Sequence, residues 1–518
     1  MPAEPVRFSD PSPHRLIVLL LDCLLVGFIL NLTLQPLVEP DLGWHLRAGL
    51  DLIAQGWRLP ATDPYSHTMP DWHWIEHAWL TDGLLAVIYR VMDPLSGLGL
   101  ILFFSGVTAL AWWVAASQAR VQRTYRLVAM VASLWVALPF LGARTQLVSL
   151  LGVAILLWGW GRVQAGQRAW VWGLPPLLLL WANLHGGFTA GLFLSGVLLC
   201  LSFMMRIGAG RPTVAASLDE PVLSWDDLRR CALALGIAVA VTFLNPYGWR
   251  LYQEIYESLT DRFMIETLRE WQPVSFQGWA GKAYGMYLAG LACLMAGWYR
   301  RVEPVRWALL LLMLGLSLRH WRNVTLFLIV SLPLVAELLA LAVASCVRRV
   351  PILKTHSATA LLLLTMGTAG ALSALGSEHL EHVWLSGKSP DVYLEQTEYP
   401  IEAVRWIRSH RQDVGTRLYN DYGYGGFLLW HFPGEKIFID GRMPAWRIGD
   451  RRIFQDYADL NREDAPRLAV LDRYAVDWGL LQRGSALALA LEAHHAWERI
   501  YADAKVVMLL ARPEGAGP

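Results

Sequence analysis

The sequence predicts a mainly α-helical polytopic membrane protein that ends in an α/β domain outside the membrane. Hydrophobic residues make up 55% of the 518-residue chain, charged residues only 17%, and the mean hydropathy is +0.36. Soluble chains of this length are far less apolar. The apolar residues gather in runs of membrane-spanning length, and this pattern stops before the last part of the chain. The net charge is +1 and the basic residues are scattered, so we expect no nucleic-acid partner.

Eleven apolar runs predict the transmembrane helices, since a helix rises ~1.5 Å per residue and a span needs about 17 to 25 residues. The runs lie near residues 16–34, 95–117, 126–142, 145–162, 170–184, 187–206, 231–246, 284–299, 305–319, 323–343 and 357–376. All five cysteines lie in or beside these runs without the spacing of metal ligands. We therefore assign the cysteines to packing.

Basic residues in the loops predict the orientation, because cytoplasmic loops carry the excess of lysine and arginine. Arg7 and Arg15 place the N-terminus in the cytoplasm. Each second loop after that is also basic, through Arg120, Arg123, Arg126, Arg162, Arg168, Arg206, Arg211, Arg229, Arg230, Arg300, Arg301, Arg306, Arg348, Arg349 and Lys354. We therefore predict a multi-pass protein of the inner (plasma) membrane with an extracytoplasmic C-terminus.

The loop 35–94 follows the first run and is predicted to lie on the outer face. Its segment 75–92 contains Asp82 and Arg90, so we place this segment along the membrane surface, which also keeps the basic loops in alternation. The tryptophans of the loop fit either an interfacial belt or a platform for sugar rings. Aromatic and titratable residues crowd its central part: Trp44, Trp57, Trp72, Trp74, Trp79, His45, His67, His73, His77, Asp41, Asp51, Asp63, Asp71 and Glu76. That density beside a membrane indicates a site.

The composition changes from about residue 385, which divides the chain into a membrane domain, 1–384, and a soluble domain, 385–518. Charged residues rise to roughly a quarter, as in soluble proteins. An amphipathic helix at 400–410, an apolar strand at 416–420 and a second strand at 436–440 begin the domain. Helix and strand signals alternate to its end, which predicts an α/β sandwich of about 130 residues.

A glycine-rich cluster stands in this domain. It consists of Asn420, Asp421, Gly423, Gly425 and Gly426, followed by Asp440, Gly441 and Arg442. The glycines fit a tight turn between strand and helix, and binding of an acceptor is the alternative.

Three arginines, Arg144, Arg319 and Arg322, stand at outer ends of the predicted spans, where the orientation rule does not expect positive charge. A bound anion would explain them. For Arg319 and Arg322 the alternatives are lipid headgroups or an ion pair with Glu270. His185, at the outer end of another span, fits either a helix cap or a functional residue.

The chain resembles the GT-C superfamily of integral-membrane glycosyltransferases. The resemblance rests on an acid just after the first span, a long outer loop, arginines at later outer span ends and an external C-terminal domain. The motifs DLGWHLRAG, DPYSHT, HAWL, WANLHGG, LNPYG and RHWRN resemble a bacterial branch of that superfamily. The likeness covers most of the membrane region.

The resemblance implies an inverting transfer of a sugar from a polyprenyl-phosphate carrier to a glycan, lipid or protein acceptor on the outer side. It carries the general base over to Asp41 and the arginine that binds the donor phosphate to Arg319 or Arg322, with Arg144 as the next candidate. Many members have paired acids in this loop, whereas Asp41 is followed by Leu42. Asp41 therefore acts alone, or Asp63 or Glu76 is its distant partner. We expect substrate-binding roles for Trp44, His45, Asp63, Glu76, His77, His185, Glu270, Trp271 and His320.

The residues suit this chemistry. A carboxylate can accept the proton of the attacking hydroxyl, which contributes ~10²–10⁴-fold. Arginine stabilises the charge on a leaving phosphate without titrating. We expect no cofactor, and a divalent metal held by Asp63, Glu76, His45 or His77 is the alternative. An oligosaccharide-block transferase or ligase of the same fold, and a non-enzymatic polysaccharide transporter or scaffold, are the competing functions.

Overall fold

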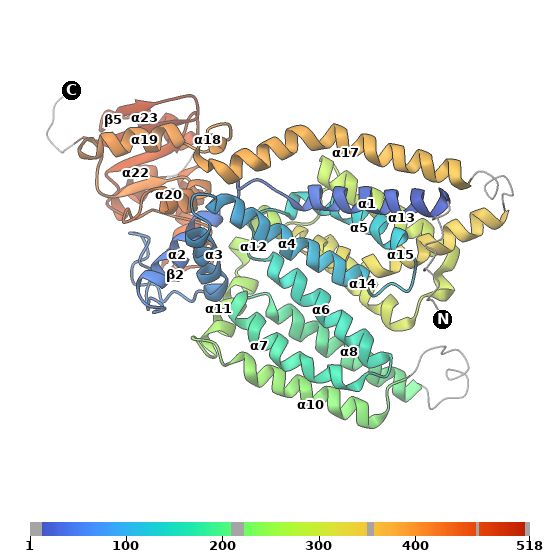
Figure 1. Cartoon of the computed structure of the whole chain (residues 1–518). Coiled ribbons are helices and arrows are strands. Elements are labelled where there is room, and N and C mark those ends of the chain that lie inside the picture. The colour runs from blue at the N-terminus through green and yellow to red at the C-terminus, as the bar shows by residue number, and fades with distance from the viewer. Residues whose placement is uncertain (1–12, 209–221, 350–356, 463–465, 513–518) are drawn as a thin grey trace, which may run out of the picture.

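The computed structural model describes residues 13–208, 222–349, 357–462 and 466–512. Arg7, Arg211 and Lys354, which enter the orientation argument, lie outside these ranges. Long helices run side by side in a bundle, and the C-terminal domain lies at one end of the bundle together with α2 (Leu42–Ala54) and α3 (Trp79–Val91) (Figure 1). We call this end the domain end.

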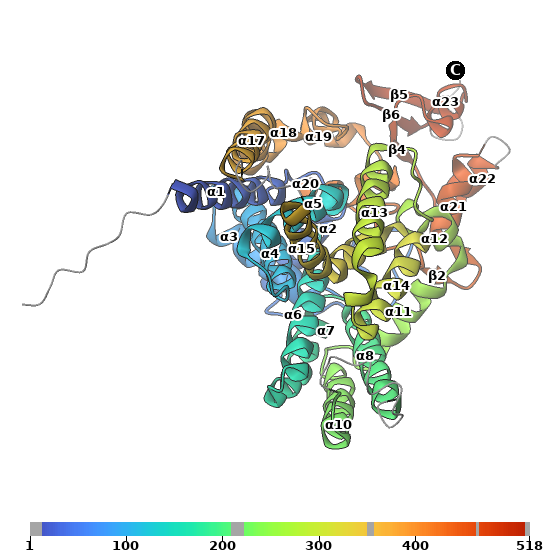
Figure 2. The ribbon, with the colours of Figure 1, turned by 90° about the vertical axis from the view of Figure 1, so that its right-hand side faces the viewer.

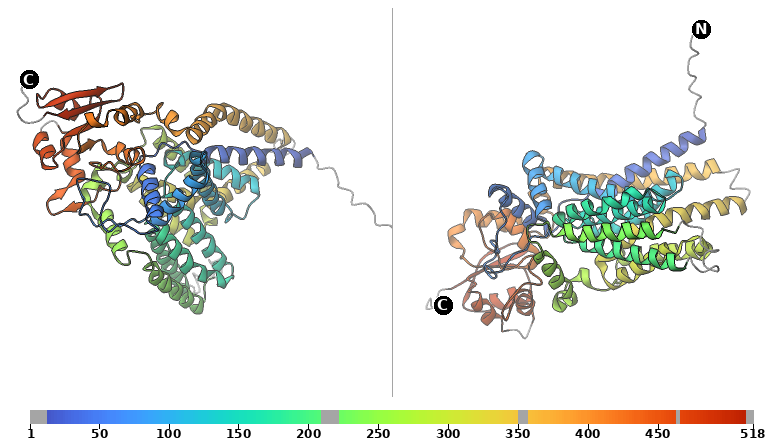
Figure 3. Two further views of the ribbon diagram at one scale, coloured as in Figure 1. Left: turned by 60° about the vertical axis from the view of Figure 1, so that its left-hand side comes forward. Right: turned by 90° about the horizontal axis from the view of Figure 1, so that it is seen from below.

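Each of the eleven predicted spans overlaps one helix of the bundle. These helices are α1 (Pro13–Thr33), α4 (Ser96–Ala116), α5 (Arg123–Ala137), α6 (Leu147–Gln164), α7 (Leu174–Leu184), α8 (Phe188–Gly208), α10 (Trp225–Thr242), α13 (Trp279–Trp298), α14 (Pro304–Arg319), α15 (Val324–Arg349) and α17 (Ser357–Lys388). Figure 2 looks along the bundle and shows α1 beside α17, with α7, α8 and α10 grouped on another side. The two views of Figure 3 show the same division into a helical bundle and a domain at its end.

Five helices within the described ranges are long and apolar enough to cross a membrane. They cover Arg15–Thr33, Ser96–Ala116, Leu147–Gln164, Phe188–Gly208 and Trp321–Arg349. The chain is therefore a multi-pass membrane protein. The segment 75–92 contains α3, which has 13 residues and is too short to span a hydrocarbon core of about 30 Å. It packs on α2 and α4 at the domain end.

Short elements complete the domain end and the turns. They are α11 (Arg250–Thr260), α12 (Arg262–Thr267), η1 (Leu138–Phe140), η2 (Arg168–Gly173), η3 (Arg269–Trp271), η4 (Tyr299–Arg301) and η5 (Trp321–Asn323). A backbone hydrogen bond joins the turns η3 and η5: the Trp321 amide donates to the carbonyl of Gln272, the residue after η3, at 2.9 Å. This pairing holds two distant loops together.

The C-terminal domain is built on a mixed four-stranded sheet. Its order is β1 (Leu418–Asn420), β4 (Trp478–Gln482), β6 (Val506–Ala511), β5 (Trp497–Ala502), with β1 and β4 parallel and the other pairs antiparallel. A small ribbon pairs β2 (Arg447–Ile448) with β3 (Arg451–Arg452). The surrounding helices are α18 (Pro390–Leu394), α19 (Ile401–Ser409), η6 (Arg411–Asp413), η7 (Tyr422–Tyr424), α20 (Gly425–His431), α21 (Ile453–Leu460), α22 (Arg467–Arg473) and α23 (Ala486–Glu492).

Part of the loop 35–94 belongs to the core of this domain. Trp44, Tyr65, Met69 and Trp74 are buried in the same hydrophobic cluster as the sheet residues. The segment 436–440, predicted as a second strand, forms only an isolated bridge, because its partner is Ser66 of the loop and not a strand of the sheet. The loop and the domain therefore fold as one body, although the sequence places the loop within the membrane domain.

A buried ion cluster joins the loop to the domain. Arg442 donates to Asp63 at 2.7 Å and to Asp440 at 2.8 Å, and its side chain is 2% exposed. Its guanidinium carbon lies 4.9 Å from the Trp74 ring centre and 5.0 Å from that of Tyr65, both from the loop. Burial of these charges is tolerated because each carboxylate is paired, and loss of the arginine would leave two unpaired acids at a cost of ~3–5 kcal/mol.

The shared core requires that the loop and the C-terminal domain lie on one side of the membrane. In a chain without its native cysteines, Thr62→Cys in the loop and Gln412→Cys in the domain place thiols at exposed positions. A membrane-impermeant maleimide added to intact cells should label both or neither.

Gln122→Cys provides the control, because it follows α4 at the end of a span that starts at the domain end. If Thr62→Cys and Gln412→Cys react in intact cells, Gln122→Cys should react only after the cells are permeabilised. If those two react only after permeabilisation, Gln122→Cys should react in intact cells. Labelling of Thr62→Cys and Gln412→Cys from different sides would contradict the common core.

Candidate functional site

Asp41 lies where the bundle, the loop and the C-terminal domain meet. It is the N-cap residue of α2 and is exposed, and its carboxylate accepts a hydrogen bond from Trp44 Nε1 at 3.0 Å. Trp44 is 4% exposed, so it orients the carboxylate and offers little free surface to a sugar. The result is an accessible acid held by a buried donor.

The glycine-rich cluster of the C-terminal domain packs against this acid. A Cβ atom on Gly441 would lie 1.8 Å from Asp41 Oδ1, and one on Gly43 would lie 2.1 Å from the Gly426 carbonyl oxygen. Only residues without a side chain allow α2 and α20 to approach this closely. The glycines therefore serve close packing of the domain on α2, beside Asp41.

Glu39 and Arg144 form an ion pair two residues before Asp41. Arg144 Nε lies 2.8 Å from Glu39 Oε1. Burial raises the pKa of the Glu39 carboxyl, and the charges of Asp41 and Glu270 add to this shift, while Arg144 opposes it. Glu270 therefore lies close to the Glu39 and Asp41 pair, although it comes from a separate loop.

A second arginine lies at the same place. Arg322 donates to Glu270 at 3.3 Å and stands 4.3 Å from the centre of the Trp271 ring. His320 Nδ1 lies 2.6 Å from the Trp271 carbonyl oxygen, which fixes η5 against η3. Arg319 is exposed at the end of α14, and no ion pair or hydrogen bond of its side chain lies within the described part of the chain.

Two histidines meet beside these arginines. The rings of His77 and His185 are 5.5 Å apart in an edge-to-face arrangement, and His185 Nδ1 lies 2.8 Å from the Ser149 hydroxyl. Burial lowers the pKa of His77 to about 4, and the charges of His45 and Arg322 act in the same direction. His77 is therefore a neutral imidazole at physiological pH.

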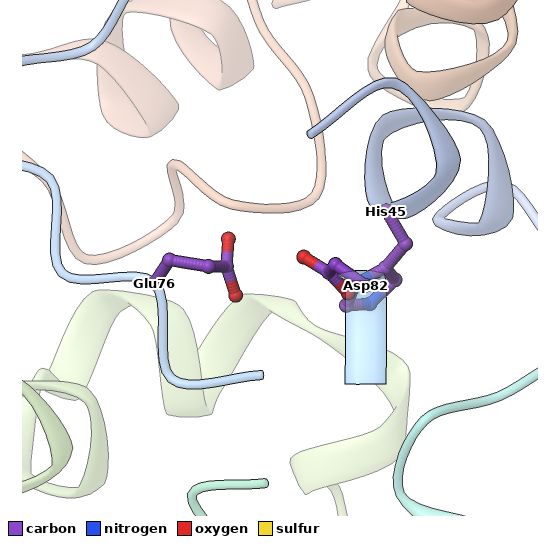
Figure 4. A group of neighbouring side chains, drawn as sticks. All are labelled: His45, Glu76 and Asp82. Atoms are coloured by element: carbon purple, nitrogen blue, oxygen red, sulfur yellow. Dashed lines mark hydrogen bonds and ion pairs between the residues drawn. The ribbon is translucent and has the colours of Figure 1, made fainter. Parts of the chain in front are cut away.

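His45, Glu76 and Asp82 form a buried group behind Asp41 (Figure 4). His45 Nδ1 lies 2.6 Å from Asp82 Oδ1, and His45 Nε2 lies 3.3 Å from the Thr145 hydroxyl. Burial raises the pKa of Glu76 to about 8 and that of Asp82 well above its usual range, and it lowers that of His45 to about 4. These shifts mark a site where charge is strongly disfavoured without a partner.

The fold of the chain matches solved membrane transferases. Archaeal oligosaccharyltransferase AglB from Archaeoglobus fulgidus, in complex with an inhibitory peptide and a dolichol-phosphate, aligns with a TM-score of 0.55 at 11% identity over 98% of this chain and 75% of that chain. The same organism's oligosaccharyltransferase tethered with an acceptor peptide aligns with a TM-score of 0.53 at 12% identity, over 98% and 75%. ArnT from Cupriavidus metallidurans in the apo state aligns with a TM-score of 0.51 at 14% identity, over 96% and 98%. The chain has the GT-C fold.

At these identities the matches concern the GT-C fold alone. Neither a scan against protein-family models nor a search of curated proteins finds a match. The argument for function therefore rests on the residues gathered at the domain end.

The GT-C fold brings most of the predicted site residues to one region. Asp41, Arg144, Glu270 and Arg322 are linked by ion pairs or by electrostatic coupling through Glu39. The same region contains Trp44, His45, Glu76, His77, His185, Trp271 and His320. Asp63 is instead fully engaged with Arg442 and with the backbone amides of Tyr65 and Ser66, which gives it a structural role in the loop.

Three acids of this region are missing from the sequence prediction. Glu39 stands two residues before Asp41, and a search for acid pairs upstream as well as downstream would find it. Asp82 occurs in a segment used only to decide on a membrane crossing. Asp440 is noted only in a cluster assigned to a turn, with acceptor binding as the alternative, and no local pattern indicates that it pairs with Arg442 beside Asp41.

Gly441→Ala should move the Asp41 carboxylate and leave the fold in place. The added methyl group would collide with the end of a side chain, which can rotate at small cost, and Gly441 does not need a left-handed backbone. A structure of the variant should show the Trp44 to Asp41 hydrogen bond broken, with a melting temperature within about 2–4 °C of the unchanged protein.

Gly423→Ala is the matched control, because a Cβ there meets nothing within 4 Å. It should leave both the hydrogen bond and the melting temperature unchanged. An intact hydrogen bond from Trp44 to Asp41 in Gly441→Ala would show that the C-terminal domain does not pack directly on the Asp41 carboxylate.

Proposed function

We propose that the protein is an inverting glycosyltransferase that transfers a sugar from a polyprenyl-phosphate carrier to an envelope or protein acceptor on the outer side of the membrane. One observation carries the proposal: an exposed, oriented carboxylate, Asp41, lies among two arginines, Arg144 and Arg322, at the end of a membrane bundle with the GT-C fold. A base and anion-binding cations are the two parts that this reaction needs.

The proposed chemistry follows from these two parts. The acceptor hydroxyl attacks the anomeric carbon from the face opposite the phosphate, and Asp41 takes its proton as the new bond forms. The bond from the anomeric carbon to the phosphate oxygen breaks, and the carrier leaves as polyprenyl phosphate. An anion develops on that oxygen, and Arg322 or Arg144 stabilises it by charge-assisted hydrogen bonds.

The arginines are held in place by acids that a phosphate would displace. Arg322 is paired with Glu270 and Arg144 with Glu39, each at partial exposure. The phosphodiester of the donor carries one negative charge, as a carboxylate does, and gains a second when the sugar leaves, so the guanidinium binds it most strongly as the bond breaks. The acids therefore keep the cations positioned and neutralised until the donor arrives.

The proposed topology places this site outside the cytoplasm. The eleven predicted spans then cross the membrane, with α5 and α7 each extended by the adjoining turn, η1 and η2. The basic loops face the cytoplasm, and the domain end with Asp41 faces outward. A reporter fused after Ala511 should therefore be active only outside the cytoplasm. Activity in the cytoplasm would reverse the proposed orientation.

A polysaccharide transporter or scaffold is the alternative without catalysis. Such a protein needs no proton acceptor at Asp41, so the Asp41 variant below distinguishes the two functions. Transfer of a whole oligosaccharide block by the same residues is a variant of the proposed reaction, and donors with one or several sugars distinguish it.

Asp41→Asn should abolish transfer while keeping the fold. The amide preserves the acceptor oxygen for Trp44 Nε1 but cannot take a proton, so turnover should fall by ~10²-fold or more. The measurement is release of polyprenyl phosphate from a panel of polyprenyl-phosphate-linked hexoses by the purified full chain, with envelope membranes as acceptor. Asp71→Asn, an exposed acid of the same loop, should turn over normally. Full turnover by Asp41→Asn would exclude this residue as the base.

Arg322 should contribute to binding of the carrier phosphate. Arg322→Ala should weaken binding of undecaprenyl phosphate by ~10–100-fold and Arg322→Lys by less, because lysine retains the charge but not the planar pair of donors. Glu270→Gln should strengthen binding, since it removes the competing carboxylate. Native mass spectrometry of the detergent-solubilised protein gives the bound fraction.

Arg229→Ala is the control for the charge lost, because Arg229 is exposed near the start of α10 and its ion pair within the described ranges is with the exposed Asp226. Equal binding by Arg322→Ala and Arg229→Ala would move the phosphate site to Arg144 or Arg319. Weaker binding by Glu270→Gln would show that the acid supports the site and does not compete for it.

A further inference from the structure

A group of three metal-binding side chains is enclosed between α2 and α3. His45 comes from α2, Glu76 from the loop before α3, and Asp82 from the first turn of α3. One ligand atom from each lies within 4.8 Å of the others. Figure 4 shows the carboxylate of Glu76 turned toward Asp82 and the His45 ring. The approach of the helices depends on Gly49, where a Cβ would lie 1.9 Å from the Asp82 carbonyl oxygen.

The group has buried lone pairs with no partner among the described residues. Glu76 Oε2 and Asp82 Oδ2 are buried without a hydrogen bond, and the two residues are 2% and 1% exposed. Buried carboxylate oxygens are normally hydrogen-bonded or bound to a cation. Glu76 Oε1 is already used by the Ala78 amide and Asp82 Oδ1 by His45, so the vacant oxygens point to a ligand that accepts their electron pairs.

We infer that His45, Glu76 and Asp82 bind a divalent transition-metal ion of the zinc or manganese type. One imidazole and two carboxylates form a donor set that suits such ions, whereas magnesium and calcium favour oxygen ligands alone. The three ligands leave one coordination position for water. The sequence analysis names His45 and Glu76 among the candidate ligands of a divalent metal but misses Asp82, because the ligands come from two helices and a loop and have no regular spacing.

The neighbours of the group fit the inference. Binding of a metal to His45 Nδ1 would replace the hydrogen bond between this nitrogen and Asp82. His45 Nε2 could then donate to the Thr145 hydroxyl at 3.3 Å, which would fix the tautomer and the ring. The ring also stacks on Trp44 with centres 3.5 Å apart. Glu76 and Asp82 also line a small pocket together with Asp51 and Trp79.

The metal would hold α2 against α3 and thereby position the acid at the start of α2. His45 follows Asp41 by one helical turn, and the His45 amide donates to the Asp41 carbonyl at 3.2 Å. This is a positioning role, independent of whether the protein transfers sugars. Binding of a metal can therefore be measured without any transfer assay.

The experiment measures metal on the full chain purified in detergent. After chelator treatment and incubation with Zn²⁺ or Mn²⁺, elemental analysis should find about one equivalent, and Co²⁺ should give a visible d–d absorption band. A 100-fold excess of metal over its Kd should raise the melting temperature by about 5 °C. Absence of bound metal and of a Co²⁺ band in the unchanged protein would overturn the inference and leave protons to neutralise the acids.

Two variants test the proposed ligands, and a third controls for the loss of a negative charge. Glu76→Gln and Asp82→Asn keep the shape of each side chain but remove an anionic ligand, so the affinity for the metal should fall at least ~10-fold. At the same metal concentration the metal-dependent rise in melting temperature should then fall to about half or less. Metal-free Glu76→Gln should melt no lower than the metal-free unchanged protein, because glutamine has the shape of glutamate and carries no charge to bury. Asp71→Asn should bind metal normally. Normal binding by Glu76→Gln and Asp82→Asn would place any metal elsewhere.

Discussion

The buried guanidinium of Arg442 is the constraint on which the domain end depends. It binds Asp63 from the loop and Asp440 from the C-terminal domain, and aromatic rings from both parts enclose it. A charge in such a place is stable only when its partners are complete. The loop and the domain must therefore fold together, and neither part has a complete core without the other.

The position of Asp41 follows from this constraint. Gly441 stands between the two charged residues of the cluster and touches the Asp41 carboxylate, so the ion cluster fixes the surface on which the acid rests. On the other side, Trp44 holds the same carboxylate by a hydrogen bond. The acid is thus exposed but has little freedom, which suits a group that must meet a substrate in one geometry.

Charge around the acid is balanced in pairs. The pairs of Arg144 with Glu39 and of Arg322 with Glu270 are partly exposed. The His45, Glu76 and Asp82 group is buried and forms no ion pair with a lysine or arginine among the described residues. The exposed pairs can exchange a carboxylate for a phosphate at moderate cost, because water still reaches them. The buried group requires a tightly held positive charge or protons, since unpaired carboxylates are not tolerated at such depth.

The sequence by itself determined the class of the protein and the identity of its polar residues near the domain end. Apolar runs near 16–34 and 323–343, and the basic loops between runs, are local patterns, and each run coincides with a helix. Helix and strand signals at 400–410 and 416–420 also agree with α19 and β1, because periodicity depends on neighbours in the chain.

Only the tertiary structure decided which of these residues meet. Asp63 and Arg442 are 379 residues apart, and the segment 436–440 pairs with Ser66 and not with a strand of its own domain. The group of His45, Glu76 and Asp82 likewise appears only in the structure, because α2, α3 and the segment before α3 bring its members together. Local patterns report which face of an element is apolar, whereas pairing between distant elements depends on the shape and burial of both partners, which no single stretch of sequence contains.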